Sequence, residues 1–205
     1  TIIVATLQGL KMHGGVPETD IKQPNVEGVK KGFANIDKHI KNLQGFGQTV
    51  LVCFNKFAQD TDEEIALVRE HCKELCVPFA LNNAFMEGGE GAVDLANLVV
   101  ETIEVQPSSE MQFTYSDDMI ITEKIEAVAK KIYGAASVSF SPEAMKKIKL
   151  AEELGYSQFP VCIAKTQYSF SQNAKAYGVP IGFNFDIKDF VINAGAEMLV
   201  AIAGD

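Results

Sequence analysis

Five consecutive apolar residues, at positions 50–54, constrain the fold more than any other stretch of this sequence. An amphipathic helical pattern precedes this stretch, and a second one follows it. A strand that is apolar on both faces belongs in the middle of a parallel sheet that helices cover on both sides. The stretch therefore predicts an α/β fold in the first half of the chain.

The remainder of the first half repeats the pattern of a strand followed by a helix. Thr61 and Glu64 have the spacing of a capping box, and Asn25 is placed to cap the helix before the central strand. The elements that we expect are strands at 2–7, 50–54 and 79–81, a loop at 9–17, and helices at 26–44, after 61 and after 91, with Gly45 as a C-cap. Residues 1–105 are thus expected to form a partial parallel sheet with flanking helices.

A polar segment at 106–118 separates this half from the next, and we expect a domain boundary there. The second domain, at 119–205, is expected to be smaller and mixed α/β, with some antiparallel pairing. Its expected helices span 121–133 and 141–154, and its expected strands lie at 161–164, 182–192 and 198–203.

Charge and composition exclude several classes of protein. The chain has 27 acidic and 18 basic residues, a net charge of −9, which argues against a nucleic-acid partner or an anionic membrane surface. It has no apolar run long enough to span a bilayer and no signal-peptide pattern, so we expect a cytoplasmic protein. The four cysteines contain no C-x-x-C pair and are expected to be small buried hydrophobic residues in a reducing compartment.

The candidate binding residues follow the ends of the expected strands. Open parallel sheets bind ligands beyond the carboxyl ends of their strands, so loops that leave neighbouring strands share one rim. The residues at this rim are Lys11 and His13 after the first strand, Asn55, Lys56 and Phe57 after the second, and Phe85 with the glycines at 88, 89 and 91 after the third.

Each of these candidates has a structural alternative. Phe57 and Phe85 either fold back onto the core or hold a flat aromatic ligand between them. The glycines either open backbone N–H groups to a ligand or form a plain turn. His13 is an acid, a base or, as we favour, a structural residue of the loop. The pair Asn55 and Lys56 resembles a base-reading motif, but Ala58 stands where that motif needs an aspartate.

No motif for chemistry is present. The sequence has neither a G-x-S-x-G nucleophile elbow nor a G-x-x-x-x-G-K-[ST] phosphate loop, and it shows no metal-ligand spacing. We therefore expect no catalytic residue and no metal ligand in this chain.

Six stretches, which run in the same order over nearly the whole chain, resemble the carboxyl-terminal part of the formate–tetrahydrofolate ligase family. They are Lys-Met-His-Gly-Gly at 11–15, Lys-Gly-Phe-Ala-Asn at 31–35, the segment 57–62, Gly-Gly-Glu-Gly at 88–91, Lys-Ile-Tyr-Gly-Ala at 131–135 and Pro-Val-Cys-Ile-Ala-Lys-Thr-Gln-Tyr-Ser at 160–169.

The resemblance implies an activity for a longer protein. Enzymes of this family couple ATP, formate and tetrahydrofolate: formate is phosphorylated to formyl phosphate, and N10 of the folate then takes the formyl group. The family implies a cytosolic homo-oligomer that uses Mg-ATP and a monovalent cation. Its phosphate loop precedes the part that this chain resembles, so we expect the fragment to be inactive alone and to need the missing amino-terminal part as a partner.

The resemblance also implies a folate site. The family's two aromatic residues that sandwich the folate fall at Phe57 and Phe85, and Leu81, Gly88 and Gly89 complete that wall, with Lys11, His13 and Glu90 as further loop contacts. Two positions depart from the family. Phe85 replaces a tryptophan, which predicts weaker stacking, and Glu197 replaces a glycine in Gly-Ala-Gly-Phe.

An alternative is a non-catalytic module that kept the fold for oligomerisation or ligand sensing. The chain begins directly with a strand pattern at Thr1, so we expect it to be a piece of a longer protein. A sheet with three of its strands leaves unpaired edges, which predicts self-association or a partner chain.

Overall fold

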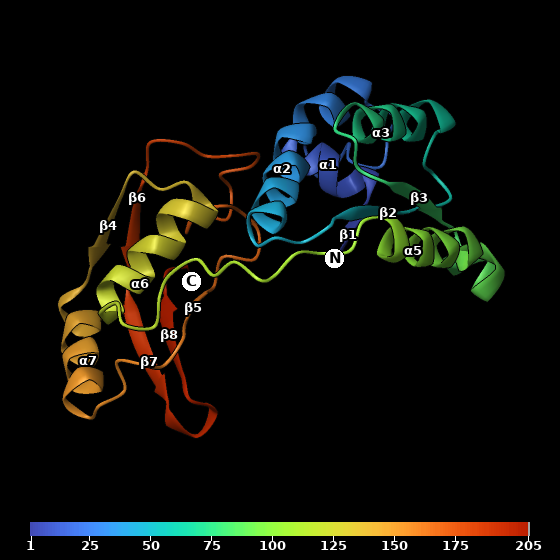
Figure 1. Ribbon diagram of the computed structural model, residues 1–205. Coiled ribbons are helices and arrows are strands. Elements are labelled where there is room, and N and C mark those ends of the chain that lie inside the picture. The colour runs from blue at the N-terminus through green and yellow to red at the C-terminus, as the bar shows by residue number, and fades with distance from the viewer. Residues whose placement is uncertain (205) are drawn as a thin grey trace. The chain divides into compact units, whose positions relative to one another are not determined.

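The computed structural model describes residues 1–204. The chain divides into two compact units, one from Thr1 to Gln112 and one from Phe113 onward (Figure 1). Both units combine helices with strands, so the expected α/β class is confirmed. The division lies within the polar segment 106–118. That the two units are separate domains with the expected boundaries stays a prediction.

Three parallel strands form the sheet of the first unit, as the sequence predicts, and their order is β1-β2-β3. Their bounds are β1 (Ile2–Ala5), β2 (Leu51–Asn55) and β3 (Phe79–Asn82). In this register Val4 lies beside Cys53, and Cys53 lies beside Ala80. Because neighbouring strands are parallel, the carboxyl ends of all three lie at the same edge of the sheet.

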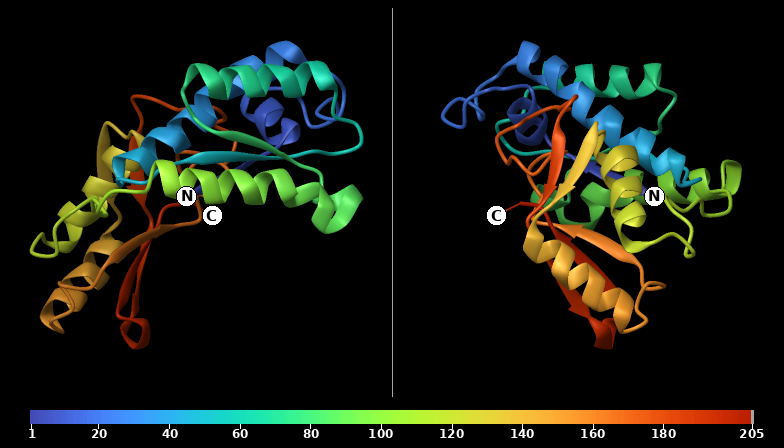
Figure 2. Two further views of the ribbon diagram at one scale, coloured as in Figure 1. Left: turned by 45° about the vertical axis from the view of Figure 1, so that its right-hand side comes forward. Right: turned by 90° about the vertical axis from the view of Figure 1, so that its left-hand side faces the viewer.

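Helices cover the two faces of this sheet unequally (Figure 2). One face carries α1 (Leu7–His13), α2 (Val26–Gly45) and α3 (Asp62–Glu74), and α4 (Ala84–Glu87) with the short η1 (Gly88–Ala92) leads to α5 (Val93–Val105) on the other. The core of the first face includes Leu7, Val29, Val52, Phe54 and Val68, all at most 1% exposed.

The expected loop at 9–17 is wrong, because most of it is helix α1. β1 ends at Ala5, and the Thr6 hydroxyl oxygen then caps α1 by accepting a hydrogen bond from the N–H of Gly9 at 3.0 Å. Gly14, one of the glycines that suggested a loop, serves close packing instead, because a Cβ on it would lie 1.9 Å from the carbonyl oxygen of Gly28. On α2, a Cβ on Gly32 would lie 2.0 Å from the carbonyl oxygen of Leu10. Glycine lets α1 and α2 approach each other closely.

The two expected helix caps are confirmed, whereas the expected C-cap is not. Asn25 accepts a hydrogen bond from Gly28 at 2.8 Å, and the Thr61 hydroxyl oxygen accepts one from the N–H of Glu64 at 3.3 Å. Gly45 still belongs to the last turn of α2. The left-handed residue is Gly47, with φ of 78°, which any side chain would strain.

The second unit holds two sheets, a parallel pair β4-β6 and a mixed sheet β5-β8-β7, in the described part of the chain. Its elements are α6 (Ile121–Val128), η2 (Ala129–Tyr133), β4 (Ser137–Phe140), α7 (Pro142–Glu153), β5 (Val161–Ala164), β6 (Asn184–Ile187), β7 (Asp189–Asn193), η3 (Ala194–Ala196) and β8 (Met198–Ile202). β7 and β8 pair antiparallel, so the expected antiparallel pairing is confirmed.

The single strand expected at 182–192 is wrong. It is two strands, because β6 pairs with β4 whereas β7 pairs with β8, and the chain changes sheets at Lys188. The N–H of Lys188 donates to the carbonyl oxygen of Ile202 at 2.8 Å at this change. β4 was not expected from the sequence. No helix among residues 1–204 has the length and apolarity to cross a membrane.

The four cysteines divide into two kinds. Cys53 and Cys72 are buried, as expected. Cys76 and Cys162 are exposed, so the expectation of four buried thiols is wrong for these two. The wrong expectation for Cys76 arose because it continues the apolar spacing of α3, although the helix has already ended at Glu74.

Candidate functional site

The ends of β2 and β3 are tied together at the carboxyl edge of the first sheet. The side-chain amide of Asn82 donates to the side-chain oxygen of Asn55 at 2.8 Å, and the backbone N–H of Lys56 donates to the carbonyl oxygen of Asn82 at 3.0 Å. These two bonds fix the points from which the next segments leave the sheet. The segments that carry Phe57 and Phe85 therefore begin side by side.

Phe57 sits on a turn that its own backbone and Asp60 hold closed. The N–H of Phe57 donates to the Asp60 carboxylate at 2.9 Å, and the N–H of Asp60 donates to the carbonyl oxygen of Phe57 at 3.0 Å. Burial raises the pKa of Asp60, while the bond from Phe57 and the charge of Lys11 lower it less. The half-buried Phe57 ring is thus carried by a rigid turn.

Phe85 is on the four-residue helix α4 and is 83% exposed. The turn before it is held by the N–H of Asn83, which donates to the carbonyl oxygen of Gly91 at 2.9 Å. The rings of Phe57 and Phe85 face each other with centroids 6.5 Å apart and planes inclined by 50°. The structure therefore brings together the two rings that the sequence leaves undecided, and Phe85 does not fold back onto the core.

The spacing of the two rings is slightly too small for a flat molecule between them. A stacked layer on each side needs about 3.5–4.0 Å between carbon atoms, or about 7–8 Å in total. The 6.5 Å separation is thus short by roughly 1 Å. Because Phe85 is exposed and lies on one turn of helix, its ring can move outward and become parallel to Phe57.

The other residues expected at the folate wall differ in burial and in the space around them. Leu81 is half-buried and packs on the core of the sheet. Gly88 and Gly89 are exposed, a Cβ on either would meet open space, and Gly88 has φ of 62°. Glu90 is also exposed. Gly91 is tight, since its Cβ would lie 2.5 Å from the backbone of Asn83.

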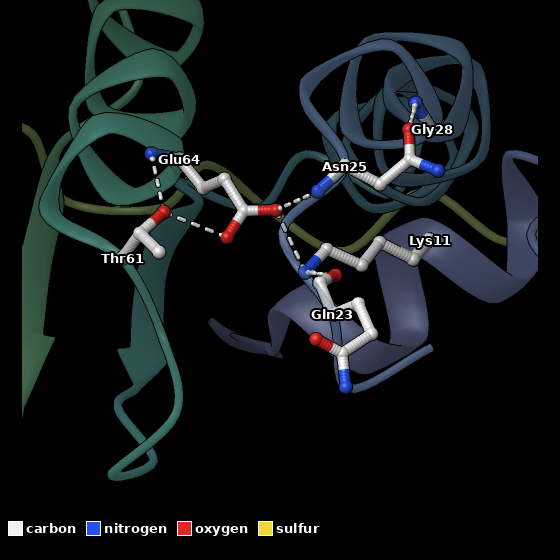
Figure 3. A network of polar contacts seen from close by, with 6 residues as sticks. All are labelled: Lys11, Gln23, Asn25, Gly28, Thr61 and Glu64. Atoms are coloured by element: carbon white, nitrogen blue, oxygen red, sulfur yellow. Dashed lines mark hydrogen bonds and ion pairs between the residues drawn. The ribbon is translucent and has the colours of Figure 1, made fainter. Parts of the chain in front are cut away.

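Lys11, a second rim candidate, is 2% exposed and holds the interior of the first unit together. Its ammonium lies 2.7 Å from the carboxylate of Glu64, which is 1% exposed, and donates to the carbonyl oxygen of Gln23 at 2.8 Å (Figure 3). Lys11, on α1, thus links this helix to Glu64 of α3. Its role as a ligand contact stays a prediction.

The carboxylate of Glu64 accepts hydrogen bonds or an ion pair from three groups. Besides Lys11, the N–H of Asn25 donates to it at 2.7 Å and the hydroxyl of Thr61 donates at 2.8 Å (Figure 3). Its own N–H is bonded to Thr61. Burial alone would raise the pKa of Glu64, but the bonds from Asn25, Lys11 and Thr61 outweigh it and leave that pKa below its ordinary value.

His13 ends α1 and lines a cavity of about 200 Å³ together with Thr6, Asn35 and His39. Burial lowers the pKa of His13. Burial also lowers the pKa of His39, and the nearby charges of His13 and Lys38 lower it further. The two imidazoles are therefore more often neutral than free histidines would be. Within residues 1–204, no cluster of His, Cys, Asp and Glu has the arrangement of a metal site.

A comparison of the sequence with known protein families shows to which family the chain belongs. The sequence model of the family described as formate–tetrahydrofolate ligase matches residues 1–205, the whole chain. The chain belongs to the formate–tetrahydrofolate ligase family. The resemblance to this family noted in the sequence is thereby confirmed, whereas the carboxyl-terminal position of the chain within the ligase stays a prediction.

Three relatives named formate–tetrahydrofolate ligase illustrate the similarity. The chain is 62% identical to the ligase of Bacteroides fragilis, 59% identical to that of Bacteroides thetaiotaomicron and 51% identical to that of Porphyromonas gingivalis, each over all 205 residues. The chain spans 37% of the length of each of these ligases.

Sequence reasoning missed two residues that position the segments carrying Phe57 and Phe85. Asp60 closes the turn under Phe57, and Asn82 ties β3 to Asn55. An aspartate three residues after Phe57 is a turn signal in its own right and could have been recognised. The bond from Asn82 to Asn55 depends on the strand register, which the sequence does not state.

Proposed function

We propose that this chain supplies the folate-binding wall of a formate–tetrahydrofolate ligase and corresponds to the carboxyl-terminal portion of that enzyme. The complete ligase would formylate N10 of tetrahydrofolate with formyl phosphate made from ATP and formate. The approach of the Phe57 and Phe85 rings to 6.5 Å at the carboxyl edge of a parallel sheet is the observation that supports this proposal most.

The proposed contacts follow from the chemistry of the pterin. Its flat ring stacks between Phe57 and Phe85, and Leu81 meets its edge as an apolar floor. Gly88 and Gly89 let the backbone approach closely, so that their N–H groups donate to polar atoms of the ring. Glu90 and His13 are proposed as further contacts around the rim, and Lys11 acts through the position of Glu64.

The proposal assigns no chemical step to this chain. Its sequence carries no G-x-x-x-x-G-K-[ST] motif, and we propose that Mg-ATP and the monovalent cation bind with the missing part of the ligase. We therefore expect no ATP-dependent formyl transfer from the purified chain, measured by the absorbance of the methenyl derivative after acidification. Activity of the chain alone would contradict this assignment. The complete enzyme is proposed to be a cytoplasmic homo-oligomer.

Calorimetric titration with tetrahydrofolate under anaerobic conditions tests the wall. The chain is expected to bind, and Phe85→Ala is expected to weaken binding about tenfold or more, because a stacked aromatic pair contributes about 0.5–1.5 kcal/mol beyond its buried area. Phe57→Ala should abolish binding. Phe113→Ala is a matched control, because Phe113 is 79% exposed but lies outside the wall.

Phe85→Trp gives a test in the opposite direction. A larger ring and an added N–H donor should tighten binding, since the family resemblance places tryptophan there. Absence of folate binding by the chain, or binding that survives Phe57→Ala, would contradict the proposed wall. Absence of binding with a stable oligomer would favour the alternative of a non-catalytic oligomerisation module.

A further inference from the structure

A cleft of about 410 Å³ opens beside the amino end of β3. It is lined chiefly by residues 76–79 and by the carboxyl-terminal halves of α3 and α5. Figure 2 shows these two helices on opposite faces of the sheet, so the cleft passes around the outer edge of β3. The proposed folate wall begins beyond the other end of this strand, after Asn82. The cleft is therefore separate from that wall, and its volume is within the range of small-molecule sites, about 300–1,000 Å³.

The walls of the cleft are mostly apolar, and part of this apolar surface is exposed. The apolar lining residues are Val77, Pro78, Phe79, Leu98 and Val105. Val77 is 5% exposed and belongs to the core, whereas Val105, at the end of α5, is 71% exposed. A ligand with an apolar body would remove the side chain of Val105 from water, and burial of apolar surface favours binding in such clefts.

Arg69, on α3, lines this cleft, and it is the only arginine of the chain. Its guanidinium carbon lies 4.8 Å from the centroid of the Phe79 ring, a cation–π contact that holds the planar group over the ring. Within residues 1–204 the guanidinium makes no hydrogen bond and no ion pair. Its planar set of N–H donors matches the two oxygens of a carboxylate. Arg69 can therefore bind an anion without giving up a bond that the fold needs.

The other charged groups of the cleft favour a ligand with one negative charge. Lys73 adds a second cation and Glu101 adds one anion, so the lining carries one net positive charge. Lys73 also pairs with Glu70 at 3.2 Å, which leaves Arg69 as the main group for an anion. The carbonyl oxygens at the end of α3 would repel an anion, but N–H groups of residues 75–77 cap them. A monocarboxylate therefore balances the charge of the lining, whereas a dianion such as a phosphate ester exceeds it.

We propose that this cleft binds a small organic monocarboxylate with an aromatic or branched apolar body. The carboxylate pairs with the guanidinium of Arg69 through two parallel hydrogen bonds, and the body packs against Val77, Phe79 and Val105. Binding forms no covalent bond. The chain thus has a second small-molecule site, which does not depend on the proposed folate wall.

Cys76 reports whether the cleft is occupied, because its exposed thiol lines the cleft, whereas the exposed Cys162 lies in the second unit. The purified chain is treated with iodoacetamide, an uncharged reagent, and peptide mass spectrometry follows the alkylation of each thiol. The probe is 4-phenylbutyrate. At four times its dissociation constant it should slow the alkylation of Cys76 about fivefold, because the unoccupied fraction falls as 1/(1 + [L]/Kd). The alkylation of Cys162 should not change.

Three further compounds separate the contributions of the charge and the body. 4-Phenylbutanol has the body without the charge, acetate has the charge without the body, and 4-phenylbutyl phosphate carries a dianion on the same body. Each should bind about tenfold more weakly than 4-phenylbutyrate, or weaker still. Equal protection of Cys76 by 4-phenylbutanol would overturn the role of the carboxylate, and stronger protection by the phosphate would overturn the preference for a monoanion.

Variants of exposed residues test the assigned contacts without disturbing the core. Arg69→Gln should weaken protection about tenfold or more, and Arg69→Lys should also weaken it, because lysine keeps the charge but not the planar donors. Val105→Asp should weaken protection by adding a negative charge to the cleft. Lys30→Gln is the matched control: Lys30 is an exposed cation of the same unit, 3.5 Å from Glu27, and does not line the cleft.

Two results would overturn the binding itself. One is protection of Cys76 that persists in Arg69→Gln, and the other is no protection in the wild type at about 20 mM probe, well above the millimolar affinity that a ligand of this size should reach. Slow alkylation of Cys76 without the probe that becomes fast on dilution would also overturn the proposal, because a second copy of the chain would then fill the cleft. None of these readouts involves folate, so a failure of the wall would be seen separately.

Discussion

Removal of the Lys11 ammonium is expected to be among the most costly single changes in the first unit. Lys11→Met keeps the length of the side chain but leaves the Glu64 carboxylate, 1% exposed, without its cation. Breaking a buried ion pair from one side costs about 3–5 kcal/mol. The bonds from Asn25 and Thr61 remain and partly compensate the carboxylate. We therefore expect a loss of about 3 kcal/mol, at the lower end of that range.

Urea unfolding followed by far-UV circular dichroism measures this loss. The five tyrosines lie between 115 and 177 and the chain has no tryptophan, so tyrosine fluorescence follows the second unit and serves as an internal reference. Lys73→Met is the matched control in the same unit. Its pair with Glu70 has an N–O distance of 3.2 Å, but the side chains are 76% and 60% exposed, and such pairs contribute about 0.2–1 kcal/mol.

The stabilisation that Glu64 contributes should also depend on pH in a defined direction. The pKa of Glu64 is depressed in the folded state, so the stabilisation is present above the unfolded value of 4.5 and is lost as the pH falls through the folded value. The difference in unfolding free energy between wild type and Glu64→Gln should therefore shrink below pH 4.5. A loss below about 1 kcal/mol for Lys11→Met at pH 7, equal to that of Lys73→Met, would refute the buried pair.

Three further outcomes are expected. Gly91→Ala should cost about 1–3 kcal/mol in urea unfolding, because its Cβ would lie 2.5 Å from Asn83, whereas Gly89→Ala should change stability little; equal effects would contradict the tight turn. Burial lowers the pKa of His39 in the folded state, so neutral His39 contributes its full stabilisation above pH 6.5 and less as the pH falls. A pH series of thermal midpoints should therefore decline less steeply for His39→Gln than for the wild type. In a timed reaction with a disulfide reagent, the exposed Cys76 and Cys162 should react at once, and the buried Cys53 and Cys72 only on unfolding. Burial and the charge of Asp37 raise the pKa of Cys72 to about 11, which slows its reaction further. Rapid reaction of all four thiols would disprove this burial.

The parts of the fold that the sequence predicts are those with strong local signals. The apolar run at 50–54 predicts the central strand, and Asn25 and Thr61 predict their helix starts. Helix α1 was missed because Gly14, at its end, suggested a loop, although this glycine allows close contact with Gly28 of α2. A sequence does not show which distant backbone a glycine approaches. The break at Lys188 was missed for a similar reason, since it depends on which strands pair.

The site divides in the same way. The sequence places Phe57 and Phe85 after successive strands, and the pairing of β2 with β3 in the structure brings the two rings to 6.5 Å. It does not place the side chain of Lys11, because the same lysine could extend into solvent at a rim or pair in the interior. Glu64, its partner, is 53 positions away, and only the packing of both α1 and α3 against α2 brings the two side chains together.

Phe57 and Phe85 differ in burial, and this difference decides which of the two positions can change in sequence more easily. Phe57 is half-buried on a turn that its backbone N–H and the Asp60 carboxylate hold closed. Phe85 is 83% exposed on a single helical turn, and the scaffold does not depend on it. One aromatic residue can therefore be exchanged for another at position 85 while the rest of the unit keeps its architecture, so the proposed folate wall can vary there most easily.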